Sequence, residues 1–264
     1  MKKLLFSAAL AALLMPVSAA AQASLDGTWK IDMSKVDFPK KPDIYLLQNG
    51  MYQCKTCVPP VSVKADGTEQ PVSGHPYYDA LAVKVVSDHE VETTFSKGGK
   101  AVASSTLTIS ADGNTLTSKF SDGSNTNGGP PVTGTSESTR VSKGVAGSHL
   151  VSGSWRTTKV PDLSDNATVW TYKVNGEEIT MTTPTGQSYT AKFSGEDAPM
   201  KGDPGTTAVS VKMIGKDVFE ETDKRDGKVI GVSIMKLTAD GKSARLTFVD
   251  KLQGTTTTAT ATKQ

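Results

Sequence analysis

The chain has 264 residues, with 29 Lys and Arg against 27 Asp and Glu, a formal net charge of +2, two cysteines and three histidines. This length is typical of about two domains, and the near balance of charge offers no basic surface of the kind that binds nucleic acid. Few Cys and His side chains are present to supply metal ligands, so the sequence predicts no metal site and no cofactor.

The N-terminal residues 1–23 predict a secretory signal peptide. Met1-Lys2-Lys3 is basic, Leu4 to Met15 is apolar, and small residues from Ser18 to Ala23 follow, which predicts cleavage near Ala23. The apolar run is shorter than the roughly 20 residues that span a bilayer, and no later stretch approaches that length. We therefore expect a periplasmic or secreted protein that does not span the membrane. Cleavage would remove two of the 29 basic side chains and leave 27 against 27 acidic ones.

The mature sequence contains an internal repeat. The segment 63–120 realigns without a gap on 191–248, always 128 positions later, and many of the shared residues are Gly, Pro or Asp-Gly pairs. A unit of about 120 residues is a whole domain and not a solenoid repeat. The repeat predicts a first domain at 24–142, a linker at 143–149 and a second domain at 150–264.

Apolar residues alternate along both copies, as at Leu81, Val83 and Val85, which indicates half-buried strands. Frequent Asn-Gly and Asp-Gly turns predict about seven to nine antiparallel strands per copy. Segments 133–140 and 255–262 are predicted to be closing strands, and 122–131 a mobile hairpin tip. Because sheets of this size must hide their edges, the fold class is all-β, with two tandem antiparallel barrels or barrel-like sandwiches.

Each copy opens on a Gly-x-Trp motif. Gly27-Thr28-Trp29 and Gly153-Ser154-Trp155 resemble the first strand of the lipocalins and the wider calycin superfamily. The resemblance implies that Trp29 and Trp155 plug the closed ends of barrels. The C-terminal helix usual in that family has no counterpart here. The chain also resembles bacterial secreted proteins of unassigned role with lipocalin-like domains.

The only two cysteines form the motif Cys54-Lys55-Thr56-Cys57. In an exported protein such a pair is expected to be oxidised. A redox-active pair would need a helix start at the first cysteine, and Val58-Pro59-Pro60 cannot continue a helix. The sequence predicts a small structural disulfide, with a redox role as the alternative.

A second difference between the copies is Gly74-His75-Pro76-Tyr77-Tyr78-Asp79, where the second copy has Gly202-Asp203-Pro204-Gly205-Thr206-Thr207. We predict His75, Tyr77 and Tyr78 as ligand-binding residues at a barrel mouth, or else as residues that pack on the adjacent strand. Trp170, aligned with Ile44, is predicted to face a cavity or to form a cross-strand aromatic pair. The acidic run 220–223 is interpreted as a solvated strand neutralised by Lys224-Arg225.

Three functions remain open. The leading hypothesis is a non-enzymatic exported protein that binds a small apolar ligand inside one or both barrels. The second is a structural or interaction module with a protein partner in the cell envelope. The third is an enzyme that uses Cys54 and Cys57, or the His75, Tyr77 and Tyr78 region, although no recognised catalytic motif is present.

Overall fold

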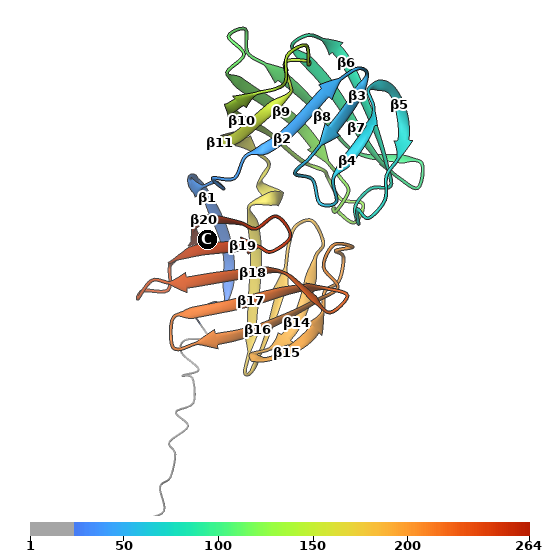
Figure 1. Ribbon diagram of the computed structural model, residues 1–264. Helices are drawn as coiled ribbons and strands as arrows, with labels where there is room; N and C mark the ends of the chain where they lie inside the picture. The colour runs from blue at the N-terminus through green and yellow to red at the C-terminus, as the bar shows by residue number, and fades with distance from the viewer. Residues whose placement is uncertain (1–23) are drawn as a thin grey trace, which may run out of the picture.

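The computed structural model describes residues 24–264, so the predicted signal peptide lies outside the described residues. The described chain is almost entirely β, with twenty strands and one short 3-10 turn, η1 (Asp165–Ala167). The strands form two ten-stranded antiparallel sheets, each curled into a nearly closed barrel (Figure 1). The predicted all-β class with two barrels is confirmed, whereas seven to nine strands per copy was too low.

The first barrel has the strand order β4-β3-β2-β11-β10-β9-β8-β7-β6-β5. Its strands are β2 (Asp43–Gln48), β3 (Met51–Cys54), β4 (Val61–Lys64), β5 (Asp66–Pro71), β6 (Ala80–Ser87), β7 (Glu90–Lys97), β8 (Lys100–Ile109), β9 (Thr115–Asp122), β10 (Val132–Lys143) and β11 (Gly153–Leu163). The two edge strands, β4 and β5, follow each other in the chain and are in contact, so the sheet returns to its starting edge.

The second barrel has the equivalent order β14-β13-β12-β1-β20-β19-β18-β17-β16-β15. Its strands are β1 (Gly27–Asp37), β12 (Val169–Asn175), β13 (Glu178–Thr182), β14 (Ser188–Lys192), β15 (Ser194–Pro199), β16 (Ala208–Ile214), β17 (Val218–Arg225), β18 (Lys228–Leu237), β19 (Ser243–Asp250) and β20 (Thr255–Lys263). The predicted closing strands coincide with parts of β10 and β20.

The two barrels exchange their first strands. β1 pairs with β12 and β20 of the second barrel, where Trp29 lies opposite Trp170. β11 pairs with β10 and β2 of the first barrel, where Trp155 lies opposite Asp43. Figure 1 shows β1 beside β20 in one barrel before the chain enters β2 in the other. Each sequence repeat therefore supplies one strand to the barrel that the other repeat builds.

The sheets consequently have different boundaries from the sequence repeats. Residues 143–149, predicted as a linker, lie where β10 turns into β11 inside the first barrel. The chain passes between the barrels at 38–42 and again at 164–168.

Short connections are compatible with both the exchanged and the unexchanged pairing. β10 ends at Lys143 and β11 begins at Gly153, so these strands can pair as a local hairpin. β1 and β2 are separated only by residues 38–42, so the unexchanged pairing would also close a short loop at small entropic cost. Once β11 occupies the position beside β10, β1 is free to fill the equivalent position between β12 and β20. Both strands carry the Gly-x-Trp motif, so each fits the other's place.

The two barrels meet at the ends where the chain crosses, which we call their open ends. In an antiparallel meander successive connections alternate between the two ends, so 72–79, 123–131, 183–187, 200–207 and 251–254 all lie at open ends. Asn127 Nδ2 donates hydrogen bonds to the carbonyl oxygens of Thr185 (2.9 Å) and Gly202 (3.0 Å). The segment predicted to be a mobile tip is thus hydrogen-bonded to the second barrel.

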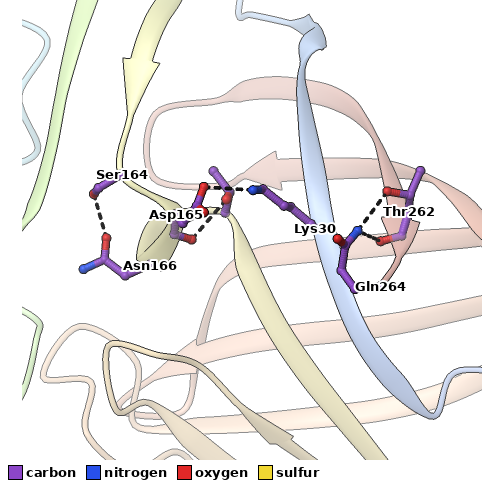
Figure 2. Close-up of polar contacts among 7 residues, drawn as sticks. Lys30, Ser164, Asp165, Asn166, Thr262 and Gln264 are labelled. Carbon is purple, nitrogen blue, oxygen red and sulfur yellow. Dashed lines mark hydrogen bonds and ion pairs between the residues drawn. The ribbon is translucent and has the colours of Figure 1, made fainter.

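The crossing itself carries an ion pair. Lys30 of β1 reaches Asp165, directly after β11, with Nζ 2.8 Å from Oδ1 (Figure 2). Ser164 donates to Asn166 at 2.6 Å in the same turn, and Asn166 Nδ2 donates to the Pro130 carbonyl oxygen at 3.1 Å. The ion pair therefore joins β1 to the turn that follows β11, and Asn166 ties that turn to the loop between β9 and β10.

The opposite, closed ends hold the two motif tryptophans. Trp29 is 0% exposed and Trp155 is 1% exposed, and each indole N–H donates to a backbone carbonyl, that of Leu25 at 2.8 Å and that of Val151 at 2.7 Å. The preceding Gly153 has φ 130°, a region that favours glycine, and an added Cβ would lie 2.3 Å from the Ser142 carbonyl oxygen. Trp29 therefore packs in the core of the second barrel and Trp155 in that of the first.

Candidate functional site

The second barrel contains a cavity of about 300 Å³. Its walls come mainly from inward-facing side chains of β12, β13, β17, β18 and β19, and the lining is largely apolar and aromatic. The lining residues include Ile31, Trp170, Tyr172, Met181, Phe219, Glu221, Ser233, Met235, Leu246 and Phe248. A cavity of this size is at the lower end of the range for small-molecule sites.

Two acidic side chains face the interior of this barrel. Phe219, Glu221 and Asp223 alternate along β17 and share its inner face, because side chains two residues apart on a strand point the same way. Tyr189 of β14 donates a hydrogen bond to Glu221 Oε2. The interpretation of this segment as a solvated, locally neutralised strand is therefore wrong for Glu221 and Asp223.

Burial changes the protonation of both acids. Desolvation, followed by the charge of Asp223, raises the pKa of Glu221 from 4.5 to about 8. Desolvation also raises the pKa of Asp223, from 3.8 to about 6, although a hydrogen bond from Glu221 partly offsets this effect. The two carboxyl groups titrate as a coupled pair, which near neutral pH holds about one proton and one negative charge.

Trp170 combines the two roles predicted for it. It lines the cavity and stands opposite Trp29 across the strand pair, and its ring meets Tyr172 edge-on with centroids 6.3 Å apart. Its Nε1 is buried and lies near the Tyr172 hydroxyl, yet it has no hydrogen-bond partner of acceptable geometry among residues 24–264. The strand pairing also makes Asp43, and not Ile44, its counterpart in the first barrel.

The first barrel has different residues at the positions of the acid pair. Thr93 corresponds to Glu221 and Phe95 to Asp223, since each occupies the same place in the paired ladders. Thr93 is buried and shares a 2.7 Å hydrogen bond with Ser105. Phe95 meets the ring of Tyr78, with centroids 4.9 Å apart. In the first barrel a hydroxyl hydrogen bond of Thr93 and an aromatic contact of Phe95 thus stand in place of the acid pair of the second.

His75, Tyr77 and Tyr78 lie together at the open ends. The His75 ring stacks on Tyr78 with centroids 4.5 Å apart, and the Tyr77 hydroxyl donates to Asp203 Oδ1 at 2.8 Å. All three line a hollow of about 170 Å³ between the barrels, with Arg225 on its other side. The structure brings these three predicted residues together, but separates them from Trp170, which lines the cavity of the second barrel.

Cys54 and Cys57 lie at disulfide distance, with their Cα atoms 5.4 Å apart. Cys54 is buried in the core of the first barrel and Cys57 packs against that core. The loop that follows touches the His75 segment, because an added Cβ at Gly74 would lie 2.9 Å from the Pro59 ring. The cysteine pair is absent from the lining of the hollow that contains His75.

Sequence reasoning missed Glu221 and Asp223, although the repeat held the necessary signal. Val91, Thr93 and Phe95 alternate as an inward-facing strand, and the residues 128 positions later are Phe219, Glu221 and Asp223. Aligning the copies places both acids on the inner face. Counting neighbouring charges along the chain concealed this, because Lys224 and Glu221 project from opposite faces of β17.

No helix in residues 24–264 is long and apolar enough to cross a membrane. Within the same residues, no group of three or more His, Cys, Asp and Glu side chains is placed to hold a metal ion. No protein-family profile and no curated protein matches the sequence of this chain.

Proposed function

We propose that this protein is an exported, lipocalin-like binding protein that holds a small, mostly apolar ligand inside its second barrel. The cavity of about 300 Å³ on the inner face of that barrel carries the proposal. Its wall is formed by aromatic, Met and Leu side chains and contains a few polar groups, the usual composition of a ligand site.

The contrast between the barrels supports assigning the ligand to the second. At equivalent positions the first barrel places Phe95, which packs on Tyr78, where the second has Asp223. The first barrel then serves to support the open end of the second, through Asn127 and Tyr77. Secretion rests on the signal peptide predicted at residues 1–23.

Binding of N-phenyl-1-naphthylamine, a neutral apolar fluorophore, tests the proposal. Ser233 lines the cavity, so Ser233→Trp fills the space and is expected to weaken binding at least tenfold. Lys236→Trp adds the same ring to the exposed outer face of the same strand and is expected to bind as the unmodified protein does. Equal binding by both variants, or no binding by the unmodified protein, would contradict the proposed function.

A further inference from the structure

The acid pair of the second barrel has no basic partner. Neither Glu221 nor Asp223 forms an ion pair with any side chain in the described part of the chain. No Lys, Arg or His contributes to the pKa shift of either acid. A buried carboxylate without a counterion is costly, so a cation that enters the barrel would be stabilised by the negative charge left on this pair.

The nearest basic side chains along the strand are engaged elsewhere. Lys224 pairs with Asp197 on the outside of the barrel. Arg225 donates from Nε to the Gly205 carbonyl oxygen at 2.6 Å. The counterion is therefore not supplied by residues that directly follow the pair.

The cavity walls suit an organic cation better than a hydrated metal ion. Trp170, Tyr172, Phe219 and Phe248 all line the cavity, and the faces of aromatic rings attract ammonium groups. The Tyr172 and Phe219 rings meet edge-on, with centroids 5.4 Å apart. The Trp170 indole N–H, which has no partner in residues 24–264, is a donor for one acceptor atom on the same ligand.

From this juxtaposition we propose that the cavity selects a small compound with a protonated amine on an apolar, preferably aromatic, skeleton. The amine lies against Glu221 and the skeleton lies among the aromatic rings. The proposal rests on the proposed function, because it names the class of ligand that the same cavity holds. A carboxylate ligand is disfavoured, since it would bring a second negative charge to the acid pair.

Three compounds of one skeleton test the selectivity: 4-phenylbutylamine, 4-phenylbutan-1-ol and 4-phenylbutyrate. Each is titrated calorimetrically into the purified mature chain at neutral pH. The amine is expected to bind at least about tenfold more tightly than the alcohol, which corresponds to about 1.4 kcal/mol, and the carboxylate most weakly.

Two variants test whether the acid pair causes the preference for the amine over the alcohol. The double variant Glu221→Gln with Asp223→Asn keeps the shape of both side chains, keeps an acceptor for Tyr189 and removes the negative charge of the pair, so it is expected to lose the preference for the amine while it binds the alcohol as before. Glu220→Gln changes the neighbouring outward-facing acid, which pairs with Lys212 at 2.8 Å, and is expected to keep the preference. Circular dichroism checks that both variants are folded.

The outcomes separate this proposal from the one on which it rests. Equal binding of amine and alcohol, tighter binding of the carboxylate, or an unchanged preference in the double variant would overturn the amine proposal. Binding of N-phenyl-1-naphthylamine without binding of any of the three compounds would overturn it too, and would leave the proposed function in place. If neither the fluorophore nor the three compounds bind, the proposed function itself fails.

Discussion

Tyr77 donates a hydrogen bond to Asp203 at 2.8 Å and packs against Gly205. Gly205 is the counterpart of Tyr77 itself, 128 positions later in the repeat, and Asp203 is the counterpart of His75. The two equivalent loops therefore meet face to face, so one copy's added side chains occupy space that the other copy leaves empty. This contact between the barrels therefore depends on positions at which the two repeats differ in sequence.

The first prediction concerns this contact. A Cβ added at Gly205 would lie 2.5 Å from Tyr77 Cζ, so Gly205→Ala is expected to lower the free energy of unfolding by about 1–3 kcal/mol through overpacking. In a Tyr77→Ala background the same change is expected to cost less than about 0.5 kcal/mol, because its obstacle has gone. Urea denaturation of the unmodified protein, the two single variants and the double variant measures the coupling between the two positions. Additive changes in the free energy of unfolding would contradict the contact.

The second prediction tests the strand exchange by cross-linking. Thr28 lies opposite Thr171, with their hydroxyl oxygens 2.9 Å apart. A chain with Thr28→Cys and Thr171→Cys is expected to form an additional disulfide under mild oxidation, because facing positions on paired strands are close enough for one. Peptide mapping by mass spectrometry under non-reducing conditions detects the bond.

The repeat itself provides the control for this experiment. Ser154, the counterpart of Thr28, lies opposite Ile44. Without the exchange Thr28 would take that place, so Thr28→Cys with Ile44→Cys would cross-link instead. We expect no such bond within the monomer, and its appearance in place of the first would rule out the exchanged arrangement.

The third prediction is a pH dependence set by the acid pair. The folded chain keeps the Glu221 proton up to a pKa of about 8, whereas the ordinary value is 4.5. Above pH 4.5 the unfolded chain binds fewer protons than the folded chain, so the free energy of unfolding falls as the pH rises toward 8. Denaturation series at about pH 6.5, 7.5 and 8.5 measure this slope. This range avoids most of the opposing effect of His75, whose pKa is lowered by burial from 6.5.

Matched variants test whether Glu221 causes the fall in the free energy of unfolding with rising pH. Glu221→Gln is expected to flatten it, since the variant has no proton to lose at that position. Glu220→Gln is expected to retain the slope of the unmodified protein. If stability rises with pH, or if both variants show the same slope, the acid pair does not control the dependence.

The fourth prediction compares the cations that cover the two tryptophans. The Arg140 guanidinium lies 3.9 Å from the centroid of Trp155 and donates to the carbonyl oxygens of Gly113, Leu150 and Ser152. Arg140→Met is expected to cost about 2–4 kcal/mol, because the cation–π contact and three charged hydrogen bonds are lost together.

The matched change in the second barrel is milder. Lys263 Nζ lies 5.1 Å from the centroid of Trp29 and donates to the Ser24 carbonyl oxygen at 2.8 Å. Lys263→Met is expected to cost about 1 kcal/mol or less, because this partly buried ammonium lies farther from its ring than Arg140 does and makes one hydrogen bond in place of three. Thermal unfolding followed by circular dichroism ranks the two variants, and the reverse order would contradict this account.

Local sequence patterns were sufficient to predict much of the fold. Alternation at Leu81, Val83 and Val85 and the Asp-Gly turns predicted strands and hairpins correctly, because strand periodicity and turn preferences act over a few residues. The same reasoning predicted the all-β class and two barrels. Comparing the copies also identified His75, Tyr77 and Tyr78, which the structure brings together at the open ends.

Sequence by itself determined that this protein consists of two copies of one antiparallel barrel, because alternation, turns and the repeat are properties of neighbouring residues. Only the tertiary structure decided which first strand completes which barrel. Gly27-Thr28-Trp29 and Gly153-Ser154-Trp155 fit either position, and short loops allow both pairings, so the choice depends on contacts between segments far apart in the chain. The tertiary structure also decided that Glu221 lines a cavity and that Asp223 faces the interior of the same barrel, because both depend on the sheet closing around them.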